Sequence, residues 1–554
     1  MAVPLSETVT QPAAAALPMR RTSRRRWLIP AALLLTYAAQ CFWFIGSQSL
    51  TVDEPGHVAA GLAMWRHGRF VMLNDQPPLA RLIFTAPLAA FTHTQVDNLH
   101  ERLFNVDPAL VHWTRPPVVL LGILLGLAVW FAAREWLSEG AANFALTLFA
   151  FSPALIAHFS LATMDGSATL TIFVVVLQLA RWRKNPDRKQ SAQLGVALGL
   201  MLLSKFYAPP LFLIALYLVT LRTADGEQHS RAWHWKHALA IAVLAWCVVW
   251  AGYFFHVSTA SVNDHNLTVH MKNRERDFVL PVNFSFPGKI IFAGGEYLDG
   301  VYNVFVHDVS GHQAMLMGKV SRTGGWKSYY FYVIALKWPL SVLVLALAGV
   351  IAIIRKRVSP PQGWPFLVAI PAAFFLMAIF SRIQIGDRHI LPLYPFALLL
   401  TAAAWQSLAN ISWARIVLLA FLVANAADCL RFAPDYMSYF TPLVDQTRSY
   451  RLLTDSNTDW GQGLIALKEY EDAHPSENIH LAYFGNVDPA IYGIRYAELQ
   501  PTDHPSGTVV VSVSHLSGQF LADPSSYKWL LQYPPKAILN HTLYVFDVPE
   551  NRGQ

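Results

Sequence analysis

The sequence predicts a polytopic membrane protein, mainly α-helical, with about eleven transmembrane helices and a small soluble α/β domain at its C-terminal end. Of the 554 residues, 54% are hydrophobic and only 14% are charged, and the mean hydropathy is +0.34. A soluble domain would struggle to keep so much apolar surface away from water. Apolar runs of about 20 residues, the length that crosses a bilayer, recur along 27–430, and shorter, strand-sized runs follow them.

The apolar runs mark the predicted membrane-spanning segments. A hydrocarbon core of about 30 Å requires about 20 apolar residues per helix. Runs near this length are bounded by charged or turn residues, and the shortest of them covers 190–204. The predicted spans are 27–47, 116–134, 141–159, 163–181, 190–204, 206–221, 238–257, 329–354, 364–381, 389–407 and 412–430.

Basic clusters predict the orientation in the membrane. The clusters RRTSRRR (20–26), RWRKNPDRK (181–189) and RKR (355–357) fall on one side if every span is real, and the positive-inside rule places that side in the cytoplasm. SRRRWL is similar to a twin-arginine export signal, but no small-residue cleavage site follows it, so 27–47 is predicted to remain as the first helix. We therefore expect a multi-pass protein of the inner (plasma) membrane with a cytoplasmic basic tail, 1–26.

Four segments then lie outside the cytoplasm. They are two large loops, 48–115 and 258–328, the short connection 382–388, and the tail 431–554. The tail contains NIHLAYFG, GTVVVSVSHL and HTLYVFDVP, which have strand length, and one helical stretch. We expect a transmembrane domain over 27–430 followed by an extracytoplasmic soluble α/β domain.

The charge and the cysteines exclude two classes of function. The formal net charge is +7 and the pI is about 9.2, but Lys and Arg gather in short clusters beside apolar runs. The charge therefore indicates topology and no nucleic-acid partner. Cys41, Cys247 and Cys429 lie within or at the end of apolar segments, without a CxxC pair or zinc spacing. We interpret them as packing residues.

Charged residues from separate apolar segments lie, by the span count, near the outer leaflet. An ionised carboxylate deep in a membrane costs about 2.5–3.5 kcal/mol on insertion scales, so Asp165 should face a wet cavity or a partner. The candidate residues are Asp53, Glu54 and His57 of TVDEPGH, Asp75 of NDQPPLAR, Asp165 of LATMDGS, Lys205 of LLSKFYAPP, and Arg382, Arg388 and His389 of SRIQIGDRHILPLYP.

Each of these residues also has an ordinary structural interpretation. Asp53 could be a solvated residue at a helix end, and Asp165 could cap its helix. Lys205 and Arg388 could extend to lipid head groups, and the histidines are more often structural residues than catalysts. Taken together, carboxylates and cations at one membrane face, beside a large ectodomain, favour a functional site.

Group transfer from a lipid phosphate would require this arrangement. A carboxylate can take the proton from an attacking hydroxyl, and cations can stabilise a phosphate leaving group. A lipid phosphate would arrive from the leaflet, where Lys205, Arg382 or Arg388 could bind it. Because phosphate leaves readily, one base could suffice.

The motifs in their order resemble a known superfamily. VDEPGH, DQPPLAR and SPALIAHFSLATMD look like the C-type (GT-C) glycosyltransferases, specifically the bacterial relatives of protein O-mannosyltransferases and of the lipid A aminoarabinose transferase. GDRHILPLYPF and DSNTDWGQGL (455–464) are similar to the phospholipid carrier-dependent glycosyltransferases. The resemblance covers about 27–470. It implies a GT-C helical fold in which a sugar passes from a polyprenyl phosphate, usually with inversion, to an acceptor outside the cytoplasm.

The resemblance also implies roles for individual residues. Asp53 would be the base or the carboxylate that orients the acceptor, Glu54 its neighbour in the acidic pair, and Asp165 the second acidic position. Asp75 stands where relatives have an acid or His before Pro-Pro-Leu, whereas Gln76 departs from their His-Pro-Pro pattern, so no role is carried over to Gln76.

The tail and the acidic pair leave two further alternatives open. Some relatives use a divalent cation, and nothing in the spacing of this sequence demands one. Residues that could supply ligands for it are Asp53, Glu54 and His57. Residues that could contact the sugar by hydrogen bonds and stacking, or serve the domain boundary, are Asp455, Asp459 and Trp460.

The base does not select one acceptor or sugar, because lipid, polysaccharide and protein hydroxyls would all suit it.

Competing functions predict other distributions of polar residues. A transporter or lipid flippase would place its polar groups near the bilayer midplane, whereas this sequence clusters them at one face. A noncatalytic subunit of an envelope assembly complex would not need Asp53, Asp165 and Lys205 together.

Overall fold

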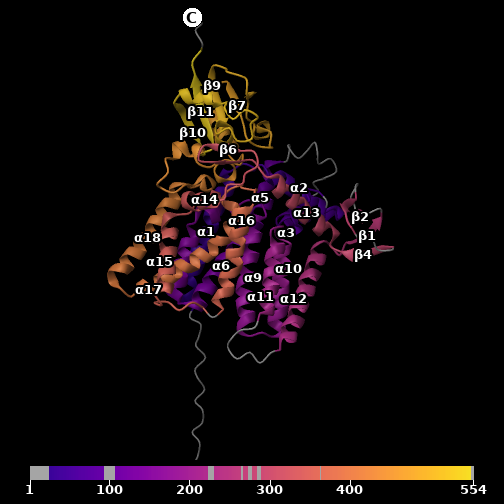
Figure 1. Ribbon diagram of the computed structural model, residues 1–554. Helices are drawn as coiled ribbons and strands as arrows, with labels where there is room; N and C mark the ends of the chain where they lie inside the picture. The colour runs from indigo at the N-terminus through magenta and orange to yellow at the C-terminus, as the bar shows by residue number, and fades with distance from the viewer. Residues whose placement is uncertain are drawn as a thin grey trace, which may run out of the picture.

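The computed structural model describes residues 24–70, 72–92, 107–221, 230–263, 266–271, 277–283, 288–361 and 363–550. Long helices form a bundle, and the C-terminal strands lie beyond one end of it (Figure 1). A smaller sheet lies beside the bundle, next to α13 (Figure 1). The prediction of a mainly α-helical protein is confirmed.

The α-helices of the described residues are α1 (Leu28–Ser47), α2 (Glu54–His67), α3 (Pro78–Phe91), α5 (Val111–Thr114), α6 (Pro116–Trp136), α7 (Glu139–Ala150), α8 (Pro153–His158), α9 (Asp165–Lys184), α10 (Arg188–Leu202), α11 (Ala208–Thr220), α12 (Arg231–Gly252), α13 (Gly295–Ser310), α14 (Tyr329–Lys337), α15 (Leu340–Ile354), α16 (Trp364–Phe380), α17 (Tyr394–Leu408), α18 (Ser412–Arg431), α19 (Leu464–Ala473) and α20 (Val513–Leu516). Short 3₁₀ helices that matter for the site are η3 (Asp387–His389) and η7 (Asp455–Asn457).

The predicted number of about eleven spans is not confirmed. Five helical segments of the described residues are long and apolar enough to cross a membrane, and a bent pair, α14 with α15, makes a sixth if it counts as one span. Three further apolar helices, α3, α11 and α16, are shorter. Helix α9 has 20 residues, but its last turn carries three basic residues, which lower its mean hydropathy. The five segments are Leu28–Ser47, Pro108–Trp136, Arg231–Gly252, Leu391–Leu408 and Ser412–Arg431.

Two predicted spans are interrupted helices. Within 329–354, α14 and α15 meet at an angle of 110°, because Pro339 between them has no N–H to continue the helix. Within 141–159, α7 ends at Ala150 and a new helix begins at Pro153, since proline is favoured in the first turn of a helix.

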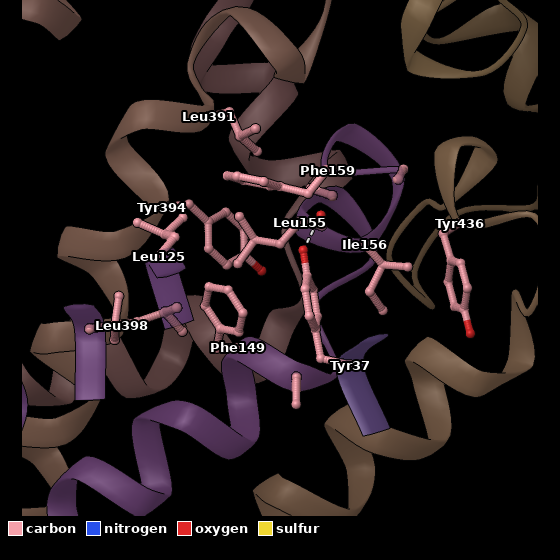
Figure 2. Packing of buried hydrophobic residues seen from close by; sticks show 14 of the residues in the cluster. Tyr37, Leu125, Phe149, Leu155, Ile156, Phe159, Leu391, Tyr394, Leu398 and Tyr436 are labelled. Atoms are coloured by element: carbon pink, nitrogen blue, oxygen red, sulfur yellow. Dashed lines mark hydrogen bonds between the residues drawn. The ribbon is translucent and has the colours of Figure 1, made fainter. Parts of the chain in front are cut away.

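The largest core contains residues of α1, α6, α7, α8 and α17; α1 packs against α6, α7 and α8, and α17 packs against α6 and α7. Tyr37 is fully buried, and its hydroxyl donates to the carbonyl oxygen of Leu155 at 3.1 Å (Figure 2). The hydrogen bond matters because a buried hydroxyl without a partner costs about 1–3 kcal/mol. Gly122 of α6 allows this approach, since a Cβ there would lie 2.3 Å from the Tyr37 hydroxyl oxygen. The Phe149 ring lies 5.0 Å from the Tyr37 ring and closes this part of the core (Figure 2).

The strands form three sheets. The sheet beside the bundle is antiparallel with the order β3-β2-β1-β4, and β5 and β6 form a hairpin. The C-terminal sheet has the order β10-β11-β9-β7-β8 and is mixed, because β7 runs parallel to β8 and β9 while β9, β11 and β10 are antiparallel. The strands are β1 (Val257–Asn263), β2 (Asn266–His270), β3 (Phe278–Pro281), β4 (Lys289–Ala293), β5 (Ala314–Leu316), β6 (Lys319–Ser321), β7 (Ile479–Ala482), β8 (Ala497–Glu498), β9 (Gly507–Ser512), β10 (Pro535–Leu539) and β11 (Leu543–Val548).

The C-terminal sheet is joined to the membrane helices through the loop after α1. Helix α19 covers one face of the sheet, and Leu50 lies in the same apolar cluster. The backbone N–H of Leu50 donates to the Tyr492 hydroxyl at 2.9 Å, and Asn486 donates to the carbonyl oxygen of Val52 at 3.2 Å. The sheet therefore lies directly against the residues that precede Asp53. That 431–554 folds as an independent domain stays a prediction.

Candidate active site

Side chains from five separate segments meet at the end of the bundle that faces the C-terminal sheet. We call them the Asp53 cluster. Every member lies at a helix end or in a turn, none in the middle of a long helix. The members are Asp53 before α2, Asp165 at the start of α9, Lys205 between α10 and α11, Arg388 in η3 and Trp460 after η7.

Asp53 and Arg388 form the accessible part of the cluster. Arg388 Nη1 lies 3.2 Å from Asp53 Oδ2, and the Asp53 side chain is 36% exposed. The Arg388 guanidinium lies 3.8 Å from the centre of the buried Trp460 ring, a cation–π contact that orients it. Burial raises the pKa of Asp53 above its usual value although Arg388 acts in the opposite direction.

Asp165 and Lys205 form the buried part. Lys205 Nζ lies 2.6 Å from Asp165 Oδ1, and Arg388 Nη1 lies 4.0 Å from Asp165 Oδ2. The Asp165 side chain is only 2% exposed. Its position in the first turn of α9 is favourable, because the helix dipole stabilises negative charge there. Asp165 thus holds both cations of the cluster near one point.

A tight turn delivers Arg388 to this point. Gly386 has φ 100°, and a Cβ there would lie 3.0 Å from the Asn457 and Ser456 side chains, so only glycine fits. The next residue, Asp387, is held by His158 Nε2 at 3.1 Å and by its own N–H, which donates to Asn457. Asp387 anchors the turn, and Arg388 is left to face the carboxylates.

Glu54 is adjacent to Asp53 in sequence but belongs to a different structure, which we call the Glu54 anchor. Its Oε1 accepts from Arg115 Nε at 2.9 Å and from the N–H of Ala162 at 2.8 Å; its Oε2 accepts from Arg115 Nη2 at 2.7 Å and from Thr51. Arg115 also donates to the carbonyl oxygens of Gln48 and Ser49. Both charged side chains are fully buried.

The anchor keeps the Glu54 carboxyl ionised and fills both of its oxygens with hydrogen bonds from the protein. Burial alone would raise the pKa of Glu54, but Arg115 and two backbone N–H groups hold it below its usual value. Because the protein itself saturates both oxygens, Glu54 has no oxygen free for an acceptor in this conformation, and a catalytic role for it stays a prediction. The carboxylate fixes the loop after α1, and with it the position of Asp53.

A third network involves His57, Asp75 and Arg81. Arg81 Nη2 lies 3.1 Å from His57 Nδ1 and 3.2 Å from Asp75 Oδ1. A guanidinium can only donate, so His57 Nδ1 accepts and its proton is on Nε2. Burial and Arg81 lower the pKa of His57 well below its usual value. The Asp75 side chain is half exposed beside the cluster.

The three predicted tail residues have distinct environments. Asp455 Oδ2 lies 4.0 Å from His312 Nε2, and burial raises the pKa of Asp455 to about 7. Asp459 is buried and accepts from the N–H groups of Gly461 and Ser514, and burial raises its pKa to about 7. Trp460 contacts Arg388. The ring is buried, so it offers no open face to a sugar in this conformation. Sugar stacking was one of the two alternatives that the sequence left open for Trp460.

Two predicted donor-binding residues lie in different places. His389 is buried between the rings of Tyr207, at 5.9 Å, and Tyr330, at 5.8 Å, and among the described residues its Nδ1 has no hydrogen-bond partner. Arg382 is exposed and bonds to the C-terminal end of α13, through Asp308 and the carbonyl oxygen of Val309. The structure does not bring Arg382 into the Asp53 cluster.

Within the described ranges, no group of three or more His, Cys, Asp or Glu side chains is arranged to hold a metal ion. Asp53, Glu54 and His57 do not fit a shared cation, because Glu54 faces Arg115 and His57 faces Arg81.

Sequence reasoning missed two arginines that are fully buried, Arg81 and Arg115. Both lie on the predicted outer side, where the positive-inside rule gives no reason for a cation. Arginine is almost never fully buried unless it is paired. An isolated arginine beside an outer helix end was therefore a usable signal for a carboxylate partner.

Comparison with known proteins supports the resemblance seen in the motifs. Residues 109–252 match the family described as dolichyl-phosphate-mannose-protein mannosyltransferase. This segment is related to the protein O-mannosyltransferases. It includes Asp165, Lys205 and Arg115, whereas Asp53 and Arg388 lie outside it. No curated protein matches the sequence.

Three solved structures align with most of the chain at low identity. ArnT from Cupriavidus metallidurans in the apo state is 14% identical and covers 93% of this chain and 97% of its own, with a TM-score of 0.47. The same ArnT bound to undecaprenyl phosphate has a TM-score of 0.45, 14% identity and coverages of 95% and 98%. The Saccharomyces cerevisiae Pmt1-Pmt2 complex bound to the sugar donor is 11% identical and covers 74% of this chain and 90% of its own, with a TM-score of 0.47. The family match over 109–252 agrees with the motifs, which resemble the protein O-mannosyltransferases.

Proposed function

We propose that the protein transfers a sugar from a polyprenyl phosphate to an acceptor hydroxyl on the extracytoplasmic side, with inversion and with Asp53 as the base. The observation that carries the proposal is the unequal exposure of the two carboxylates that share Arg388. The Asp53 side chain is 36% exposed, and that of Asp165 is 2% exposed. An acceptor can therefore reach Asp53, while Asp165 holds the cations.

The reaction follows from this division. An Asp53 oxygen takes the proton of the acceptor hydroxyl, whose oxygen attacks the anomeric carbon opposite the lipid phosphate. The bond between that carbon and the phosphate oxygen breaks, and its electron pair stays on the phosphate. Arg388 and Lys205 stabilise the negative charge that develops there. The products are the inverted glycoside and polyprenyl phosphate.

The donor reorganises an existing ion pair. In the structure, Arg388 contacts Asp53 and Lys205 contacts Asp165. A phosphate between the two cations competes for Arg388, which frees Asp53 to accept a proton at the moment the donor is bound. The unpaired Nδ1 of His389, in the same region as Lys205, adds a further polar atom for the donor.

The position of the cluster favours transfer over transport. All its members lie at helix ends or turns next to an ectodomain, whereas transporters bind near the bilayer midplane. We place the protein in the inner (plasma) membrane, with a cytoplasmic N-terminus and the C-terminal sheet outside. Its partners are the polyprenyl-phosphate sugar and a lipid, polysaccharide or protein acceptor.

The test uses purified protein in lipid and a panel of labelled polyprenyl-phosphate sugars, with cell-envelope extract as acceptor. Release of polyprenyl phosphate by the wild type, and not by Asp53→Asn, supports the proposal and identifies the donor. If no donor reacts while transport of a labelled lipid depends on Asp165, the protein is a flippase or transporter.

A further inference from the structure

A groove lies at the far end of the bundle from the Asp53 cluster. It runs between the last turns of α6 and α9, which lie side by side (Figure 1), and has a volume of about 480 Å³, within the range of about 300–1,000 Å³ typical of ligand pockets. Asp165 starts α9 at the cluster and Arg181 follows 16 positions later. At 1.5 Å per residue the groove is about 24 Å away along the helix.

The groove is divided into an apolar part and a charged end. Its apolar wall consists of Ala128, Phe131, Val174 and Leu177. One helical turn further along each helix, the lining changes to charged and polar side chains. These are Arg134, Glu135, Gln178 and Arg181.

The charged end is cationic on balance. Arg181 Nη2 lies 3.2 Å from Glu135 Oε2, so this pair is neutral. Arg134 lies over the Trp130 ring at 5.1 Å; among the described residues it has no ion-pair partner, so it adds one positive charge. Arg26 approaches from the start of α1, where Trp27 packs on Trp130 at 5.2 Å and on Phe131 at 5.8 Å. Arg26 lies 3.9 Å from Glu139.

We propose that this groove binds an anionic glycerophospholipid. An acyl chain lies along the apolar wall, and the phosphate accepts hydrogen bonds from Arg134 and Arg181. Basic pockets between transmembrane helices bind anionic head groups in this way, and arginine suits phosphate because its fork donates two parallel bonds. The order of the lining, apolar within the bundle and cationic at its end, matches the order of tail and head group in one leaflet. Neither free phosphate nor a soluble anion would use the apolar wall.

The lipid would join three helices that are far apart in sequence. The groove is built by α6 and α9, and Trp27 connects it to the start of α1. A ligand that binds only the folded state raises stability with its concentration. We therefore expect an anionic lipid to raise the melting temperature without taking part in transfer.

The experiment is native mass spectrometry and thermal unfolding of the full chain in a neutral detergent. Phosphatidylglycerol and phosphatidylcholine with the same acyl chains are added separately, and glycerol phosphate serves as the ligand without a tail. We expect one retained phosphatidylglycerol, no retained glycerol phosphate, and an upward shift of the melting temperature with phosphatidylglycerol alone. Equal retention of the two lipids would overturn the proposal.

Variants locate the site. Arg134→Ala with Arg181→Ala should weaken phosphatidylglycerol binding by about tenfold or more, since hydrogen bonds to charged groups contribute about that much. Glu135→Gln should strengthen phosphatidylglycerol binding, because it removes a charge that repels the phosphate. Ala128→Phe should weaken phosphatidylglycerol binding, because the larger side chain occupies the apolar part of the groove. The matched control is Arg355→Ala with Arg357→Ala. These exposed arginines follow α15 at the same end, where Trp136 donates to the carbonyl oxygen of Ser359.

The single variants keep the proposal testable even if the double mutant does not fold. If that protein does not fold, Glu135→Gln still tests the proposal. Weaker or unchanged phosphatidylglycerol binding by this variant would contradict an anionic head group beside Glu135. An equal loss in the control would mean that positive charge at this end, and no built site, attracts the lipid. A dimer that forms without lipid and is broken by Ala128→Phe would show that a second copy of the chain occupies the groove.

Discussion

The Asp53 cluster and the Glu54 anchor begin at adjacent residues, and they differ in exposure and in saturation. The Glu54 anchor is closed, because both carboxylate oxygens and Arg115 are fully buried and bonded to each other and to the backbone. The Asp53 cluster is open, because Asp53 shares Arg388 with Asp165 and remains partly exposed. An ion pair that is already saturated can only hold structure, whereas a shared cation and an exposed carboxylate can bind and react.

The largest expected effect separates the two regions by activity. Asp53→Asn should lower transfer by about 10²–10⁴-fold, the usual contribution of a general base, while the unfolding temperature stays close to that of the wild type. Turnover with saturating donor and a thermal unfolding curve measure both. Full activity in this variant would remove Asp53 from the role of base.

The next effect is on stability. Arg115→Leu leaves Glu54 buried without a partner and should reduce the free energy of unfolding by about 3–5 kcal/mol. The control is Arg448→Leu, which breaks an exposed pair with Asp445 and should change the free energy of unfolding far less. Chemical unfolding in detergent measures both changes. Equal losses would show that the anchor is no more important than a surface ion pair.

A smaller effect appears in the pH dependence. Arg388 lowers the pKa of Asp53 against the effect of burial, so Arg388→Gln should raise that pKa further. Because Asp53 must be ionised to accept a proton, the acidic limb of the rate profile should move to higher pH. The same variant should weaken donor use more than acceptor use. A rate profile that does not move, or one in which only acceptor use changes, would mean that Arg388 does not face both groups.

The smallest effect concerns Asp455. Its pKa is about 7 in the folded chain and about 3.9 when unfolded, so the folded state holds an extra proton between these values. Wild-type stability should therefore fall as the pH rises from about 4 to about 7. Asp455→Asn, which also tolerates the positive φ of 60°, should remove the part of this dependence that comes from Asp455, while the part from Asp459 remains.

The difference in melting temperature between Asp455→Asn and the wild type should increase from about pH 4 to about pH 7 and stay constant above pH 7. Each kcal/mol of stability that the wild type loses should add about 1–2 °C or less to this difference, given the size of the chain. Asp547→Asn, at an exposed strand position, is the control and should show no such trend. If the melting temperatures of the two proteins differ by the same amount at every pH, the change in stability comes from the αL backbone at this position and not from the buried carboxyl.

Several features of the fold and the site could be predicted from residues alone. Composition and apolar runs predicted a helical membrane protein, and the span count predicted that Asp53, Asp165, Lys205 and Arg388 lie at one face, where the structure has the four in contact. The span count itself failed where helices break, as at Pro339, because a window of apolar residues does not distinguish a straight helix from a bent one.

What the sequence by itself determined is the class of environment for each segment, since hydropathy and charge depend on residue type alone. What only the tertiary structure decided is which of two adjacent carboxylates is free. Glu54 meets Arg115, 61 positions away, and Asp53 meets Arg388, 335 positions away. The physical reason is that successive residues at the start of a helix point in directions about 100° apart, so the partner of each is set by the packing of distant segments.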